Sequence, residues 1–192
     1  TLAHLALGGK VGATRLAQAL VELKRQPDPE EFTLLANHSS EPAVGKAFAN
    51  LLSQPASQRT SLESLLRARQ QLTDAQLPRL VAAAAKALLA REPSDASSDL
   101  LLRLASGFKL KELEPEVIAF VTKTNQTDDR KLTGLRALRE MGAEQLALFQ
   151  QFALSGKPGN PLQREAIGAL ASAKSERAVP MLLEMWTVLP GG

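Results

Sequence analysis

The chain has 192 residues, of which 44% are hydrophobic and 22% are charged, and this balance excludes a wholly disordered protein. The net charge of +3 is small and evenly spread, with eleven Lys and Arg against nine Asp and Glu in residues 1–96 and twelve against eleven in residues 97–192, so the concentrated basic patch typical of a nucleic-acid-binding domain is missing. The chain has no cysteine, which excludes disulfides, thiolate nucleophiles and zinc–thiolate sites within it.

Leucine and alanine supply most of the apolar residues, isoleucine occurs only at Ile118 and Ile167, and tyrosine is absent. Leucine and alanine favour helices, whereas strands favour β-branched and aromatic residues, so the composition predicts an all-α fold. No apolar run approaches the roughly 18–20 residues of a membrane span. The longest Ala/Leu stretch, residues 80–90, is interrupted by Lys86.

Apolar residues recur at the three- and four-residue spacing of an amphipathic helix along almost the whole chain, and no convincing alternating strand pattern occurs. In chain order the stripes are Leu16, Ala19, Leu20 and Leu23; Val44, Ala47, Phe48 and Leu51; Leu62, Leu65 and Leu66; Leu77, Leu80, Val81, Ala84 and Leu88; Leu101, Leu104, Ala105 and Phe108; Leu113, Val117, Phe120 and Val121; and Val179, Leu182, Leu183 and Trp186.

The breaks between the stripes predict helix starts. Pro29 precedes two glutamates, which suits a helix N-terminus. The segment 39–42 is typical of a cap followed by an early proline, and Thr73 with Gln76 has the spacing of a capping box. The segments between breaks predict about eleven or twelve helices, hence five or six helical hairpins.

The hairpins also superimpose on one another. Leu104, Leu138 and Leu170 align at successive offsets of 34 and 32 residues. Within residues 97–192 the match is clear for the last two hairpins and fair for the one before them, and it is poor before residue 95. One such hairpin cannot bury its apolar face alone, so the repetition predicts an α-solenoid, with residues 1–192 as a single domain. Because the chain begins at Thr1 and ends in Pro-Gly-Gly, we expect it to be a fragment of a longer protein.

Two segments near the C-terminus resemble a HEAT repeat: Arg164–Leu170 as its first helix and Arg177–Leu183, with an Ala-Val-Pro-x-Leu-Leu pattern, as its second. Residues 136–142 resemble the end of another first helix. The specific match covers about a third of the chain. The resemblance implies a HEAT-like (ARM-like) α-solenoid that acts as a protein-binding scaffold.

A narrower resemblance covers residues 164–190, which are similar to the HEAT region of large planctomycete-type secreted proteins. Those proteins join a sugar-dehydrogenase-like propeller, HEAT repeats and a haem domain with a Cys-x-x-Cys-His motif. The present chain has neither that motif nor a propeller signature. The resemblance therefore implies the connector of a bacterial, secreted or periplasmic protein rather than its chemistry.

Three groups of residues could suggest a chemical site. His4 and His38 lie far apart, and His38 is expected at a helix end or in a loop rather than on a metal. The segment 8–12 has glycines and Lys10, but lacks the strand and the Gly-Lys-Ser/Thr ending of a phosphate loop, so we expect a helix to end at its glycines. The carboxylates Glu112, Glu114, Glu116, Asp128 and Asp129 are expected to serve helix N-termini and a loop cap.

The basic cluster comprises Arg130, Lys131, Arg136 and Arg139, with Arg164 one repeat later. These side chains could line the inner curve of a solenoid and hold phosphate or acidic groups. The alternative, which we favour, is salt bridging within the repeat to Asp128, Asp129 or Glu140, with packing of the aliphatic stems. Trp186 is expected to pack in the core, or on a neighbouring repeat.

The sequence thus predicts no catalytic, cofactor or metal site and no enzyme. We expect a scaffold that binds a protein partner or spaces neighbouring domains of a larger protein. The alternative is nucleic-acid or polyanion binding on a concave basic face. The oligomeric state is left open.

Overall fold

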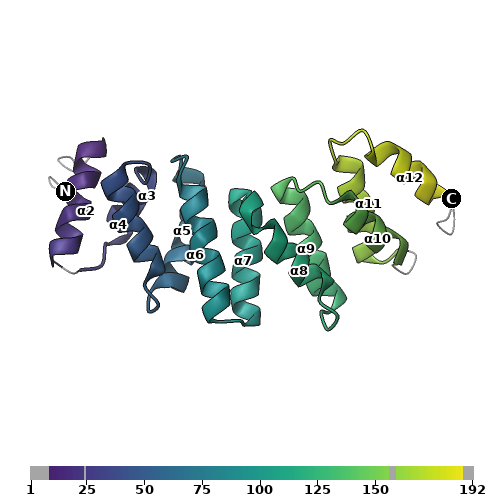
Figure 1. Cartoon of the computed structure of the whole chain (residues 1–192), viewed down its shortest axis with the longest axis horizontal. Helices are drawn as coiled ribbons and strands as arrows, with labels where there is room; N and C mark the ends of the chain where they lie inside the picture. Colours follow the sequence, from purple (N-terminus) through teal and green to yellow (C-terminus); the bar gives the residue numbers. More distant parts are fainter. Residues whose placement is uncertain (1–8, 24, 156–158, 188–192) are drawn as a thin grey trace. The chain divides into compact units, whose positions relative to one another are not determined.

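The computed structural model describes residues 9–23, 25–155 and 159–187 (Figure 1). These residues form eleven α-helices and two short 3₁₀ helices, and no strand occurs among them. The prediction of an all-α fold is therefore confirmed. The chain divides into two compact units, residues 1–104 and 105–192, which are described separately below. The single continuous domain stays a prediction.

The first unit contains the helices that precede residue 95 and the first part of the next one. Its elements are α2 (Gly9–Leu23), α3 (Pro29–Asn37), α4 (Pro42–Ser53), α5 (Gln58–Ala68), η1 (Arg69–Gln71), α6 (Leu77–Arg91) and α7 (Asp95–Phe108), which begins in this unit and ends in the second.

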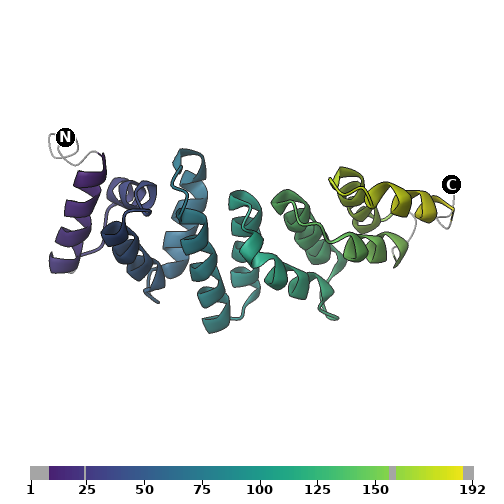
Figure 2. The same cartoon turned by 45° about the horizontal axis from the view of Figure 1, so that its top comes forward.

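The helices of the first unit alternate between two rows. Helix α4 contacts both α2 and α6, whereas α3 contacts α5, and from α2 to α6 each helix contacts the next one across the rows (Figures 1 and 2). The predicted stripes line the space between the rows: Val44, Phe48, Leu62 and Val81 are fully buried. The rings of Phe32 and Phe48 join α3 to α4, with centroids 5.1 Å apart. The apolar stripes of this part of the sequence are thus buried between helices.

The second unit continues the alternation. Its elements are the end of α7, η2 (Lys111–Leu113), α8 (Glu114–Thr122), α9 (Asp128–Met141), α10 (Leu146–Ser155), α11 (Pro161–Ser172) and α12 (Ala178–Trp186). Helix α9 contacts α8 and α11, and α10 contacts α11 and α12. The aligned leucines Leu138 and Leu170 are fully buried, as the superposition of the hairpins predicts.

Helices α8 and α9 approach each other closely at Gly134. A Cβ atom at this glycine would overlap Cγ2 of Val121 and lie 3.2 Å from Cδ1 of Phe120. Four residues before it, the Arg130 guanidinium lies 5.1 Å from the centroid of the Phe120 ring. The small residue therefore lets the two backbones pack together.

The helix caps confirm one expectation and contradict another. The structure has a capping box at Asp28 and Glu31, where the Asp28 carboxylate accepts from the amides of residues 30 and 31 and Glu31 accepts from the Asp28 amide. The box predicted at Thr73 and Gln76 is wrong, because α6 begins at Leu77 without a side-chain cap. The segment 39–42 does contain the predicted cap and early proline, since Glu41 is the N-cap residue of α4 and Pro42 begins the helix, while Ser39 and Ser40 bond to Asp74.

The stripe assigned to α12 is the larger correction. Val179, Leu183 and Trp186 are 62%, 66% and 66% exposed, and the buried residues of this helix are Ala178 and Met185. Leu23 of α2 is likewise exposed rather than buried. Periodicity identified these helices correctly, but it did not show which helix faces are buried by the rest of the chain.

Candidate functional site

Of the histidine and glycine candidates, the structure describes His38 and residues 9–12. His4 and Gly8 lie outside the described residues, as does the helix expected before Gly8. His38 is the C-cap of α3, as predicted, and its backbone amide donates to the Leu35 carbonyl at 3.2 Å. Gly9 begins α2, so residues 9–12 form a first helical turn rather than a loop that wraps phosphate.

The carboxylate candidates lie at helix starts, as predicted. Glu114 and Glu116 occupy the first turn of α8, and Asp128 and Asp129 occupy the first turn of α9, where negative charge is favoured. Glu114 also accepts a hydrogen bond from Gln145 of α10 at 2.6 Å. Over the described ranges, no group of three or more His, Cys, Asp and Glu side chains could hold a metal ion.

Two members of the basic cluster converge on one buried carboxylate. Nε of Arg136 lies 3.2 Å from Oε2 of Glu165, and Nη1 of Arg139 lies 2.8 Å from Oε1 of the same residue. Glu165 belongs to α11, so these ion pairs join neighbouring hairpins. The sequence had predicted pairs within one repeat, to Asp128, Asp129 or Glu140, and that prediction is wrong for these two arginines. The shared carboxylate neutralises part of the positive charge that could attract phosphate.

The other members of the cluster lie elsewhere. Arg130 stacks on Phe120, Lys131 is half-buried in α9, and Arg164 is exposed on α11. The structure therefore brings together Arg136 and Arg139.

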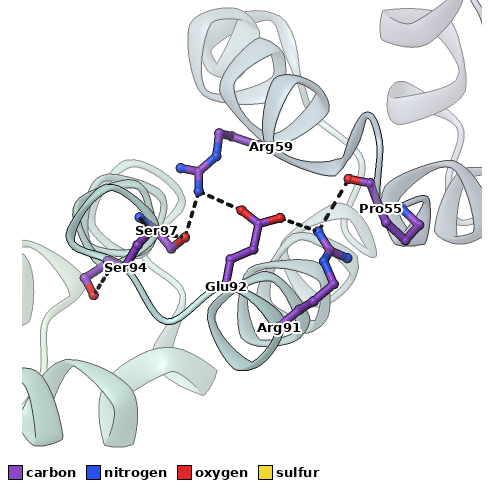
Figure 3. Close-up of polar contacts among 7 residues, drawn as sticks. Pro55, Arg59, Arg91, Glu92, Ser94 and Ser97 are labelled. Atoms are coloured by element: carbon purple, nitrogen blue, oxygen red, sulfur yellow. Dashed lines mark hydrogen bonds and ion pairs between the residues drawn. The ribbon is translucent and has the colours of Figure 1, made fainter.

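Glu92 ties three helices of the first unit together (Figure 3). Its carboxylate accepts from Arg59 of α5 at 3.0 Å and from Arg91 of α6 at 3.1 Å. The same Arg59 nitrogen donates to Ser97 of α7 at 2.8 Å. The hydrogen bond from Arg59, followed by that from Arg91, lowers the pKa of Glu92. We call such a cluster a tie, meaning a set of hydrogen bonds between side chains of neighbouring hairpins.

Asp74 forms a second tie. Its carboxylate accepts from the Ser39 hydroxyl at 3.1 Å, and from the Ser40 hydroxyl and amide at 2.7 and 2.9 Å. The Gln76 amide donates to it at 2.8 Å. Burial alone would raise the pKa of Asp74, but these hydrogen bonds outweigh that cost and hold the pKa below its ordinary value. The turn before α4 is thus fixed to the segment before α6.

The exposed face of α12 is the first candidate binding surface. Val179, Leu183 and Trp186 recur at positions i, i+4 and i+7, so they lie on one side of the helix. This α12 stripe lies near the exposed charges of Arg177 and Glu184. An apolar patch with a polar rim is typical of a protein-interaction surface.

The second candidate is a cavity of about 490 Å³ in the second unit, here called the turn groove. It lies where the turns that follow α7, α9 and α11 meet, and these are called the first, second and third turns below. Lys109 and Lys111 follow α7, residues 140–144 cover the end of α9 and the turn toward α10, and Lys174 follows α11. The lining also includes Phe149 and Ala169, which are both buried, and Arg139, Ser172 and Ala173. The rim is charged and the deeper wall is apolar.

The third candidate is a cavity of about 620 Å³ that lies between α3 and α5. Phe32 and Leu65 line it together with hydroxyl side chains. The two charged residues of its lining are both engaged: Asp28 caps α3, and Arg67 donates to Ser64 at 3.1 Å. It therefore offers hydrogen-bonding groups but no available charge.

Comparison with known proteins gives no relative. No family model matches the chain, and no match was found among curated proteins or solved structures. Within the described ranges, none of the helices combines the length and the apolar character that crossing a bilayer requires.

Proposed function

We propose that the chain is a HEAT-like α-solenoid and a non-catalytic scaffold, which binds a protein partner or spaces the domains of a larger protein. The observation that carries the proposal is the sequence separation of the polar ties. Ser40 and Asp74 are 34 residues apart, Arg59 and Glu92 are 33 apart, and Asn160 and Asp128 are 32 apart. Two other pairs, Arg136 with Glu165 and Arg59 with Ser97, lie on either side of these values, at 29 and 38 residues. In a repeat array each unit contacts its neighbour, so long-range contacts recur at one repeat length.

The helix starts support the same period. Helices α4, α6, α8, α10 and α12 begin at residues 42, 77, 114, 146 and 178, which are intervals of 32 to 37 residues. These intervals are shorter than the roughly 40–47 residues of the usual HEAT repeat. The proposal is therefore a compact HEAT-like repeat with short turns.

The α12 stripe supports a protein partner. A tryptophan and a leucine that are each 66% exposed on one helix face provide the kind of anchor found at the centre of protein interfaces. Nucleic-acid binding has weaker support, because Arg136 and Arg139 already share Glu165. We therefore do not propose it.

Photo-crosslinking tests the scaffold proposal. A benzoylphenylalanine at position 183, in the stripe, is compared with one at Ala119, which is exposed on α8. We expect position 183 to crosslink one protein that Ala119 does not. That protein, made pure, should bind the chain, and Leu183→Asp with Trp186→Asp should weaken binding by about tenfold or more. No specific crosslink at position 183, or an unchanged affinity of the double variant, would contradict a partner at this surface.

A further inference from the structure

The end of α7 has an unusual backbone. Lys109 has φ of +53°, the left-handed region that side chains other than glycine rarely occupy. The Leu110 amide donates to the Ala105 carbonyl at 2.9 Å, and buried Leu110 packs behind the turn. This is the hydrogen-bond pattern of a Schellman motif, in which the left-handed residue is usually glycine.

The next hairpin provides the comparison. Helix α9 ends at Gly142, with φ of +71°, and the Ala143 amide donates to the Leu138 carbonyl at 3.0 Å. Gly142 and Lys109 therefore occupy equivalent positions, 33 residues apart. A lysine at this position destabilises the turn relative to glycine. Strain of this kind is often retained where the side chain has a function.

The side chain at this strained position lines the turn groove. Lys109 and Lys111 contribute positive charge from the first turn, Glu140 and Glu144 contribute negative charge from the end of α9 and the turn after it, and Lys174 contributes positive charge from the third. Arg139 also lines the groove, but its Nη1 lies 2.8 Å from the carboxylate of Glu165. The three lysines and the two glutamates are all exposed, and none of them forms an ion pair with a residue that the structure describes. The groove thus presents available charges in the order positive, negative, positive.

We propose that the turn groove binds an extended acidic peptide of a protein partner, with Lys109, Lys111 and Lys174 as its anchors. The proposal rests on the scaffold function and names the chemistry of one partner segment. Carboxylates of the peptide pair with the lysines of the first and third turns, and a basic residue between them faces Glu140 and Glu144. The apolar wall at Phe149 lowers the local dielectric and so strengthens these pairs.

The spacing of the turns sets the spacing of the peptide's charges. Packed helices lie about 8–10 Å apart, so the first and third turns are separated by about 16–20 Å. An extended peptide advances about 3.3 Å per residue, which places its two acidic groups about five or six residues apart. A nucleic-acid backbone, by contrast, carries uninterrupted negative charge and would meet the two glutamates at the second turn.

Fluorescence anisotropy tests this binding. The probe is a fluorescein-labelled peptide of about nine residues with aspartates five positions apart and one lysine midway, a spacing that follows from the turns. We expect saturable binding that weakens with added salt. A second peptide with aspartate and lysine exchanged should bind at least about tenfold more weakly. Equal binding of both peptides, or no saturable binding of the first up to about 1 mM, would overturn the proposal.

Charge-reversal variants test whether peptide binding depends on the lysines of the groove or only on the net charge of the protein. Lys109→Glu with Lys174→Glu should weaken binding by about tenfold or more, whereas Lys46→Glu with Lys123→Glu, which has the same net charge and changes lysines outside the groove, should stay within about twofold. Lys109→Gly is the sharper variant, because it should raise the urea midpoint of unfolding while weakening binding. If the groove variants bind as the unmodified chain does, or if an oligonucleotide of similar length binds more tightly than the peptide, the proposal is wrong. If the peptide does not bind to the groove but position 183 still crosslinks its partner, the scaffold proposal is retained.

Discussion

Asp74 shows how single residues hold neighbouring hairpins together. Its partners Ser39 and Ser40 precede it by 35 and 34 residues, and together with the Gln76 amide they surround one carboxylate. Because these donors prefer the ionised form, the native state binds a proton at Asp74 less readily than the unfolded chain does. The tie is therefore a source of pH-dependent stability.

Asp74→Asn should lower the free energy of unfolding at pH 7 by about 1–2 kcal/mol, since it weakens hydrogen bonds to a charged group. The stability from a carboxylate with a lowered pKa is present above the ordinary value of about 3.9 and is lost as pH falls through the lower native value. The two proteins should therefore converge in acid. Urea unfolding between pH 3 and pH 7 measures this, with Glu22→Gln as an exposed control. A difference that persists unchanged at pH 3 would contradict the assignment.

Trp186, the chain's one tryptophan, reports directly on the α12 stripe. Because it is 66% exposed, its fluorescence maximum should shift little when the protein unfolds in urea, and iodide should quench it in the native state. Dynamic light scattering of the same sample checks that the chain is not associated. A clear red shift on unfolding of a monomeric sample would mean that Trp186 is buried.

At the scale of helices, close packing depends on a few small residues. Gly134 of α9 leaves no room for a methyl group against Val121 and Phe120, whereas Gly168 of α11 has only the end of the Arg139 side chain nearby, at 3.4 Å. The two glycines thus offer the same substitution in two surroundings.

Gly134→Ala should destabilise the protein by about 1–3 kcal/mol, because the overlap with α8 outweighs the gain in helix propensity. Gly168→Ala should be neutral or slightly stabilising, because its Cβ would lie 3.4 Å from Nη1 of Arg139, an ordinary contact that leaves the gain in helix propensity. Thermal and urea unfolding of both variants measure the difference. Equal stability of the two variants would contradict the close approach of α8 and α9.

The sequence predicted the helices more accurately than the contacts that each helix makes with the rest of the chain. Stripes such as Val44, Phe48 and Leu51 are buried as expected, because local periodicity determines which face of a helix is apolar. The same rule failed for Val179, Leu183 and Trp186, because periodicity does not say whether another helix covers the face. The partner of Arg136 and Arg139 was also missed, since Glu165 is 29 residues from Arg136 and no local pattern links them.

The turn groove was missed for a related reason. Lys109, Glu144 and Lys174 belong to different turns, and only the packing of hairpins brings them to one cavity. One signal was present in the sequence: Lys109 lies 33 residues before Gly142, one residue from the offset of 34 that relates Leu104 to Leu138, so a lysine stands where the next hairpin has glycine. Comparing equivalent helix ends would have marked it.

At the scale of the whole molecule, the account rests on hairpins that are stabilised by their neighbours. Helices α11 and α12 contact α9 and α10, and the carboxylate of Glu165 joins α11 to α9. In such an array the stability is approximately a sum of repeat and neighbour contributions, so a terminal hairpin can be removed without unfolding the others.

The most direct measurement is therefore the urea unfolding, followed by far-ultraviolet circular dichroism, of a chain that ends at Ser155 and lacks α11 and α12. The account predicts that the remaining helices keep their helical signal in proportion to their length and unfold cooperatively at a lower urea concentration. Loss of helical signal throughout the shortened chain, or a midpoint unchanged from that of the full chain, would contradict a stack of mutually supporting hairpins.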